Sequence, residues 1–133
     1  MKIVLYADAD NTTANQIELL IQAKLSDIKV ERVQSLESLL AKLRKPLHGF
    51  SVVLAYVVSG LDMERLATVK LLFDNVRLIL VLPGREQEQT ILGLKLNPCF
   101  MSYQDSAPED ALSVLETIGR RQKGIKGWDA GET

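Results

Sequence analysis

Five short apolar runs alternate along this chain with five segments whose apolar residues recur at helical spacing. The apolar runs span residues 2–6, 28–33, 51–58, 76–82 and 99–103. The run at 51–58, SVVLAYVV, is nearly continuous in β-branched and aliphatic residues, which is typical of a central strand covered on both faces. Strands that alternate with helices in this way form a parallel sheet with right-handed crossovers and helices on both faces. The order of elements therefore predicts an α/β fold.

The segments between the apolar runs predict helices over about 13–25, 35–45, 62–73, 86–95 and 106–122. Thr13, Ser35 and Asp62 stand where the side chain that caps a helix N-terminus is expected. In the short, polar fourth helix, we expect Ile91 and Leu94 to be the apolar anchors.

A chain of 133 residues has the length of one domain. We expect a flavodoxin-like three-layer α/β/α sandwich with a five-stranded parallel sheet of order 2-1-3-4-5. The domain is expected to span residues 1–122. Residues 123–133 show no apolar period, so we expect a flexible C-terminal tail or the start of a linker. Any ligand of such a sheet sits beyond the carboxyl ends of the first and third strands.

Composition excludes several classes of function. Sixteen Lys and Arg against 17 Asp and Glu give a net charge of −1, which argues against direct nucleic-acid binding. One cysteine and one histidine exclude an internal disulfide, a cysteine-based zinc cage and a His-rich metal site. The longest uncharged stretch, 50–61, is too short to span a membrane, and no targeting segment precedes it. We therefore expect a cytoplasmic protein without a membrane partner.

Two stretches resemble the receiver domains of two-component response regulators. Residues 76–105 follow the spacing of the family's fourth strand, fourth helix and fifth strand without a gap, including Gly93-Leu94 in the helix. Residues 51–63 follow the family's third-strand segment. The resemblance covers about residues 2–121 and implies the same fold.

The resemblance also implies positions for the phosphorylation machinery of the family. The phosphoacceptor aspartate falls on Ala55, which has no oxygen to phosphorylate. The hydroxyl residue after the fourth strand becomes Leu82, the switching aromatic becomes Met101, and the lysine that binds the phosphoryl oxygens becomes Gln104. This pattern predicts a degenerate receiver that lacks the phosphoacceptor.

The metal-binding acids of the family are also incomplete. The first of the paired acids becomes Ala7, so Asp8 and a possible extra ligand, Asp10, are all that remains to hold Mg²⁺. Without a third carboxylate such a site is open and weak, and we expect no cofactor. The segment 10–15 has a superficial likeness to the phosphate loop of flavodoxins, but it contains no glycine for close approach of a phosphate.

These positions predict a phosphorylation-independent signalling module rather than an enzyme. In the family, the face made by the fourth helix, fifth strand and fifth helix docks partners, so we expect a protein partner or a homodimer through residues of about 86–121. The expected setting is a two-component or phosphorelay-type system. Two alternatives remain open: a domain that binds a small molecule, either flavin or an effector, and a receiver that still binds metal through Asp8 and Asp10.

Overall fold

The computed structural model describes the backbone of residues 1–45, 49–73, 76–84 and 86–132, and side chains within these ranges up to residue 120. Its strands are β1 (Lys2–Tyr6), β2 (Lys29–Val33), β3 (Val52–Tyr56), β4 (Arg77–Leu82) and β5 (Phe100–Tyr103). Its helices are α1 (Thr12–Lys24), α2 (Leu36–Leu43), α3 (Gly60–Thr68), α4 (Gln87–Lys95) and α5 (Pro108–Glu132), with a short 3₁₀ helix, η1 (Lys70–Phe73).

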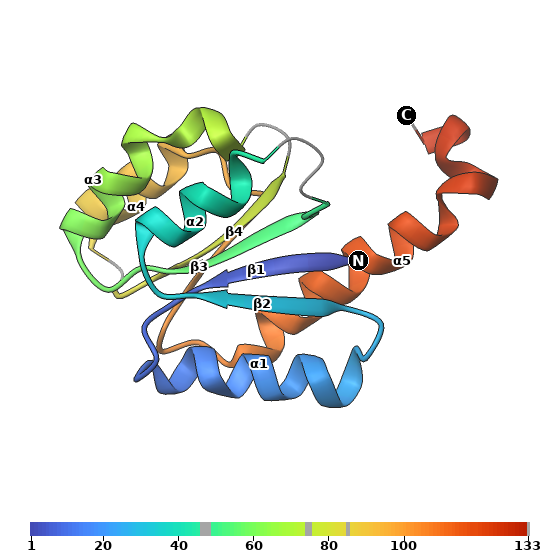
Figure 1. Ribbon diagram of the computed structural model, residues 1–133, viewed down its shortest axis with the longest axis horizontal. Coiled ribbons are helices and arrows are strands. Elements are labelled where there is room, and N and C mark those ends of the chain that lie inside the picture. Colours follow the sequence, from blue (N-terminus) through green and yellow to red (C-terminus); the bar gives the residue numbers. More distant parts are fainter. Residues whose placement is uncertain (46–48, 74–75, 85, 133) are drawn as a thin grey trace.

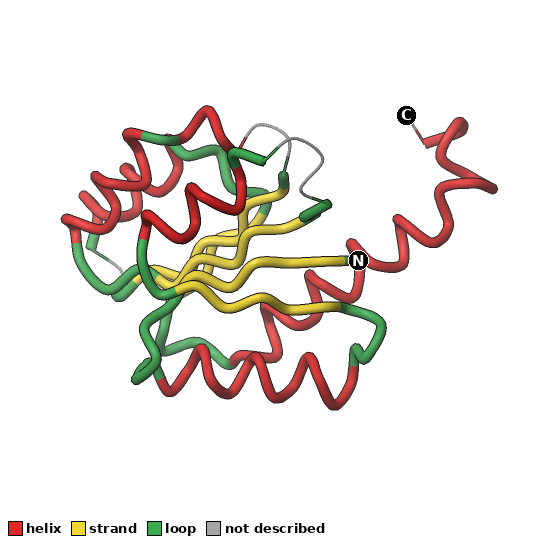
Figure 2. The backbone as a smooth tube through the Cα atoms, viewed as in Figure 1, coloured by secondary structure: helices red, strands yellow, loops and turns green. Residues whose placement is uncertain are grey.

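All five strands are parallel and lie in the order β2-β1-β3-β4-β5. Helices α1 and α5 cover one face of this sheet, and α2, α3 and α4 cover the other (Figures 1 and 2). The predicted fold class and strand order are therefore confirmed.

The core consists of two apolar clusters, one on each face of the sheet. Because successive residues of a strand point to opposite faces, Leu54 and Tyr56 join the cluster under α1 and α5, whereas Val53 and Ala55 join the cluster under α2, α3 and α4. Every residue of β3 is buried, as expected for a central strand. Full burial of one Leu or Ile side chain contributes roughly 1.5–3 kcal/mol, so these two clusters supply the main driving force for folding.

Two helices begin earlier than the sequence predicts. The amide of Ala14 donates to Asn11 Oδ1 at 3.0 Å, so Asn11 rather than Thr13 caps α1. Ser59 rather than Asp62 caps α3 by accepting from the Asp62 amide at 3.3 Å. In each loop a side chain that can accept a hydrogen bond lies two or three residues before the expected cap, and it caps the helix in place of the expected residue. Ser35 caps α2 as expected.

Helix α4 faces the sheet with a different side from the one predicted. Ile91 and Leu94 are exposed, whereas Leu92 and Leu96 pack into the cluster under α2, α3 and α4. Gly93 is buried at the centre of the contact, where a Cβ atom would lie only 2.9 Å from the sulfur of Met101. The missing side chain of Gly93 lets the helix approach the sheet, which turns Ile91 and Leu94 outward.

The last helix continues past the predicted end of the domain at residue 122. Its backbone is helical to Glu132, and its C-terminal part extends beyond the sheet and the other helices (Figure 1). In the segment expected to be a tail, 123–133, the backbone is helical as far as Glu132, and the side chains lie outside the part that the structure describes. None of the helices, within the described residues, is long and apolar enough to cross a membrane.

Candidate functional site

The carboxyl ends of the strands meet at one edge of the sheet and bring the predicted site positions together. Tyr6 in β1 pairs with Ala55 in β3, and Leu82 in β4 pairs with Tyr103 in β5. Gln104 follows directly after Tyr103, and its backbone N–H donates to the backbone carbonyl of Leu82 at 2.9 Å.

The side chains at the acceptor and hydroxyl positions cannot take part in phosphoryl chemistry. Ala55 and Leu82 are both fully buried and belong to the same apolar cluster. The neighbouring Tyr56 carries a hydroxyl group, but burial raises the pKa of this phenol far above its ordinary value, which leaves it protonated and a poor nucleophile. No group at this position can replace an aspartate as acceptor.

Gln104, at the lysine position, uses its side chain to join two strand ends. Its Nε2 donates to the backbone carbonyl of Val57 at 2.8 Å, only two residues beyond Ala55. Val57 is itself bound through its amide to the Val81 carbonyl at 2.9 Å. The Gln104 amide group therefore connects the end of β5 to the end of β3 and offers no positive charge to an anion.

Sequence reasoning missed the central polar contact of this edge, which Arg32 makes from β2. Its guanidinium donates to the carbonyls of Ala7 and Asp8 and fixes the loop between β1 and α1. The same group donates to Asn15 Oδ1 at 2.9 Å and forms an ion pair with Glu18 at 2.8 Å. The only sequence signal was a charged residue in a strand predicted to be exposed.

The residues present do not fit a magnesium site. Asp8 and Asp10 are both exposed, and within the described residues no group of three His, Cys, Asp or Glu side chains could hold a metal ion. Magnesium requires oxygen ligands in near-octahedral geometry. The carbonyl oxygens of Ala7 and Asp8 already accept from the Arg32 guanidinium, a cation built into the protein.

Met101, at the position of the switching aromatic, packs inward beneath α4. Its sulfur lies close to Gly93, at the point where a side chain on that residue would overlap it. Met101 is partly buried in the cluster of that face. This position therefore contributes packing, and its side chain has no hydroxyl or ring to reorient.

A polar cleft lies beside the degenerate site, where β1, β2 and β3 end. It has a volume of about 580 Å³. Its polar lining comes from β1, β3, α2, α3 and the loops between them, and consists of Tyr6, Asp8, Gln34, Ser35, Glu37, Tyr56, Asp62 and Arg65. Burial raises the pKa of the Tyr6 phenol, and the carboxylates of Asp62 and Asp8 raise it further against the opposing charge of Arg65.

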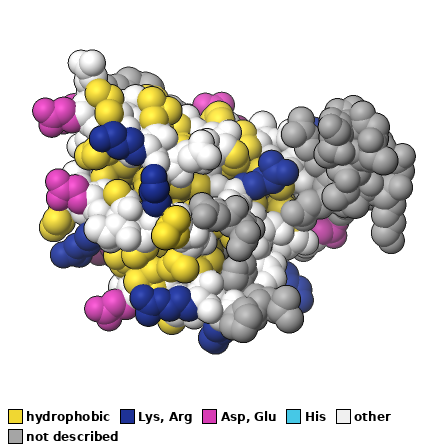
Figure 3. All heavy atoms as spheres, turned by 90° about the horizontal axis from the view of Figure 1, so that it is seen from above, with side chains coloured by type: hydrophobic (Ala, Val, Ile, Leu, Met, Phe, Trp, Pro, Cys, Tyr) yellow, Lys and Arg dark blue, Asp and Glu magenta, His cyan; other side chains and the backbone are white. Residues whose placement is uncertain are grey.

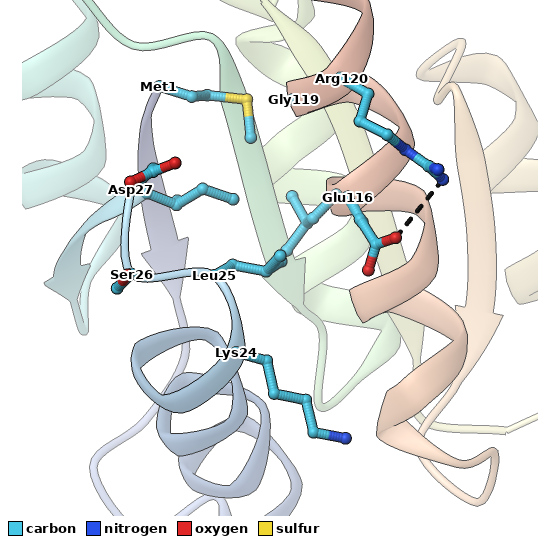
Figure 4. Close-up of a pocket in the computed structure, with 10 residues that line it drawn as sticks. Met1, Lys24, Leu25, Ser26, Asp27, Glu116, Gly119 and Arg120 are labelled. Carbon is cyan, nitrogen blue, oxygen red and sulfur yellow. Dashed lines mark ion pairs between the residues drawn. The ribbon is translucent and has the colours of Figure 1, made fainter.

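A second hollow lies at the opposite edge of the sheet, between the end of α1 and α5 (Figure 4). It measures about 410 Å³ and has an apolar floor to which Met1, Leu25 and Leu115 contribute. Glu116 and Arg120 form an ion pair of 3.4 Å on its α5 side. None of the positions that the receiver resemblance assigns to phosphorylation lines this hollow.

Comparison with known proteins gives a match by structure only. No protein-family model matches the chain, and no curated protein matches it by sequence. A CheY-like response regulator receiver domain protein from Methanospirillum hungatei matches with a TM-score of 0.70 and 18% identity, over 92% of this chain and 98% of that one.

Two further structures match over most of this chain. The pilus assembly protein CpaE from Caulobacter crescentus matches with a TM-score of 0.64 and 14% identity, over 88% of this chain and 98% of that one. RcsB from Salmonella enterica serovar Typhimurium, bound to the promoter rprA in the presence of phosphomimetic BeF₃⁻, matches with a TM-score of 0.68 and 15% identity. That match covers 98% of this chain and 76% of the other. The chain therefore has the fold of CheY-like response regulator receiver domains.

Proposed function

We propose that this protein is a phosphorylation-independent receiver-like module that acts in signalling by protein–protein interaction, not as an enzyme. The observation that carries the proposal is the replacement of the acceptor by Ala55, which is fully buried among apolar side chains. Gln104 supports it, because its side chain is engaged with the Val57 carbonyl. A carboxylate at the acceptor position and a cation at the lysine position are both missing from this arrangement.

The proposed docking surface is the face formed by α4, β5 and α5, at about residues 86–121. Ile91 and Leu94 on α4 are 46% and 60% exposed, although both are large apolar side chains. Figure 3, which views the molecule from the side of α2, α3 and α4, shows apolar side chains on the surface with Lys and Arg between them. Exposed apolar side chains framed by charge are typical of protein interfaces. The occupant is either a partner protein or a second copy of this chain.

The structural matches support a setting in signal transduction and leave the pathway open. They include both response regulator receivers and a pilus assembly protein. We place the protein in the cytoplasm, in a two-component or phosphorelay-type system, where partner binding replaces the phosphoryl switch.

The first test measures intact mass after incubation with magnesium and a small-molecule phosphodonor. We expect no phosphoryl mass, either in the natural protein or in an Asp8→Ala/Asp10→Ala variant. An adduct that forms in the natural protein and disappears in the variant would place an acceptor after β1 and refute the proposal.

The second test concerns the docking surface. An Ile91→Glu/Leu94→Glu variant places two charges on the exposed side of α4 and should abolish self-association or partner capture. A Leu19→Glu variant is the control, since Leu19 is 66% exposed on α1, on the other face of the sheet. Equal association of both variants, measured by sedimentation velocity and by pull-down, would contradict the assignment of this surface.

A further inference from the structure

Helix α5 continues past the part of the chain that packs around the sheet. It runs from Pro108 to Glu132, a length of about 37 Å, and its C-terminal part extends away from the sheet and the other helices (Figure 1). We call residues 121–132 the extension. Three glycines, at 124, 127 and 131, lower its intrinsic stability as a helix. Because helices in proteins owe most of their stability to the packing of one face, we expect the extension to pack against another molecule.

One face of α5 continues from the domain into the extension. Inside the domain, Val114 and Ile118 lie on the face that packs in the cluster under α1 and α5. Alternate steps of three and four positions from Ile118 reach, in turn, Arg121, Ile125, Trp128 and Glu132. Residues three and four positions apart share one face of a helix. The buried face therefore continues as a stripe with a cation at one end, an acid at the other and two large apolar residues between them.

This stripe is complementary to a second copy of itself in the antiparallel direction. In an antiparallel pair, Ile125 of one copy lies opposite Trp128 of the other. The same register places Arg121 of each copy opposite Glu132 of the other. The other charges of the extension keep the same order, with cations before the acid: Lys123, Lys126 and Asp129. A parallel pair would place like charges opposite each other, which is unfavourable, so charge favours an antiparallel pair of identical extensions.

Gly119 marks the point where α5 leaves the domain. It lines the hollow between α1 and α5, next to Arg120 (Figure 4). A Cβ atom on Gly119 would lie 3.8 Å from Met1 Cε, which is an ordinary contact, so the packing of this chain does not require glycine there. In the antiparallel pair, the end of one extension lies close to this point of the other copy. A residue without a side chain leaves room for it.

We propose that the extension forms an antiparallel pair with the extension of a second copy of this chain. Ile125 and Trp128 form the apolar centre of this dimer, and Arg121 and Glu132 form ion pairs at its two ends. The inference goes beyond the proposed function, because it assigns self-association to the extension. The face formed by α4, β5 and α5 then remains available to a different protein.

The fluorescence of Trp128 tests the proposal directly, because Trp128 is the only tryptophan of the chain. The apolar centre is small, and small interfaces give weak, reversible association. In sedimentation velocity of the whole protein, we expect dimers at about 100 μM and monomers at about 1 μM. The Trp128 emission should shift to longer wavelengths over the same dilution. A protein that is monomeric at the higher concentration, or a dimer that dissociates without this shift, would refute the proposal.

A matched pair of variants tests which face of the extension associates. Ile125→Glu and Ala130→Glu add the same charge, but position 130 lies on the opposite side of the helix from the stripe. We expect Ile125→Glu to raise the Kd of the dimer about thirtyfold, and Ala130→Glu to change it less than about twofold. Equal Kd values for the two variants would overturn the assignment. The urea midpoint of each monomeric variant shows whether the domain is intact.

Exchange of charges tests the antiparallel register. Arg121→Glu and Glu132→Arg each place like charges opposite each other, and each should raise the Kd of the dimer about tenfold. The double variant restores opposite charges only in an antiparallel pair, so its Kd should return to within about threefold of the natural value. A double variant as weak as the single variants would overturn the register.

The variant of α4 separates this inference from the proposed function. Ile91→Glu/Leu94→Glu leaves the extension unchanged, so we expect this variant to dimerise with the natural Kd while it loses partner capture. If this variant loses the dimer and Ile125→Glu keeps it, self-association belongs to the α4 face and the inference is refuted. Partner capture by the α4 variant would instead contradict the proposed docking surface and leave the dimer unaffected.

Discussion

Restoring the aspartate of active receivers at position 55 is the sharpest test of how far this site has changed. Ala55 is fully buried, pairs with Tyr6 and Leu80 in the sheet, and points into the apolar cluster under α2, α3 and α4. In Ala55→Asp, no side-chain cation stands at the lysine position, because Gln104 is uncharged and already donates to the Val57 carbonyl. The substitution should therefore destabilise the protein and create no phosphoacceptor.

The size of the effect follows from the cost of burying a charge. Burial raises the pKa of a carboxyl by several units, and a rise of about 3 units corresponds to about 4 kcal/mol once the pH exceeds the raised value. Ala55→Asn is the matched control, because it has the same size and polarity without the charge. Extra volume in a packed core costs both variants about 1–3 kcal/mol.

The assay is urea unfolding of both variants at about pH 5 and about pH 8, with the free energy of unfolding compared between them. A raised pKa in the folded state means that the unfolded state releases its proton first as the pH rises. The Ala55→Asp variant should therefore lose stability relative to Ala55→Asn between the two pH values. Added magnesium should not restore it.

Two results would refute this reasoning. Equal stability of the two variants at both pH values would show that the introduced carboxyl reaches water, so position 55 would not be sealed. A phosphoryl adduct on Ala55→Asp would show that the remaining residues suffice for phosphoryl transfer without a lysine at position 104.

Three further predictions test the packing and the charges around the sheet. Arg32→Met should destabilise the protein by about 2–3 kcal/mol through the loss of charge-assisted hydrogen bonds, with faster amide exchange in the loop after β1 as the check. Gly93→Ala should lower stability in urea by about 1 kcal/mol, because overlap with Met101 outweighs the gain in helix propensity. Side-chain hydrogen bonds from Lys42, which has the larger effect, and from Lys2 lower the pKa of Glu31. The ion pairs of the Glu31 carboxylate therefore stabilise the folded protein at neutral pH, and this stabilisation is lost in acid. The urea midpoint of Glu31→Gln should therefore change less between about pH 7 and about pH 3 than that of the natural protein, whereas an equal change would contradict the ion pairs.

The fold was predictable because the periodicities of the chain are unambiguous. The run at 51–58 could only be a strand covered on both faces, and β3 is buried throughout. Ala14, Ile17 and Ile21 recur at helical spacing, and all three are buried beneath α1. For five strands that alternate with five helices, the right-handedness of the crossover connections and the short chain allow only a few orders of the strands in the sheet. The observed order β2-β1-β3-β4-β5 is the predicted one.

Errors arose where a short segment offered two solutions of similar energy. In α4, nine residues contain three large apolar side chains, Ile91, Leu92 and Leu94, and the packing at Gly93 decided which of them face the sheet. Cys99 directly precedes the edge strand β5 and is exposed, although it opens the apolar run at 99–103. Neither outcome is encoded in a local pattern.

The site positions could be aligned from the sequence, but their contacts could not. Nothing local indicates that Arg32 reaches the carbonyls after β1, or that Gln104 reaches the carbonyl of Val57, because these contacts join residues 25 and 47 positions apart. The place of the polar cleft, beyond the ends of the first and third strands, was expected, but its set of carboxylates was not, since they come from three separate segments. Contacts of this kind depend on how the strand ends come together in the folded sheet.

The hydrogen bond between Gln104 and Val57 also has a mechanical consequence. Strand β5 has only four residues and lies at the edge of the sheet, and α5 follows it along the chain. By reaching past β4 to the end of β3, the Gln104 side chain anchors this edge strand to an interior one. A pull on α5 is therefore shared between β5 and β3, so the edge strand resists peeling away from the sheet more strongly than its length suggests.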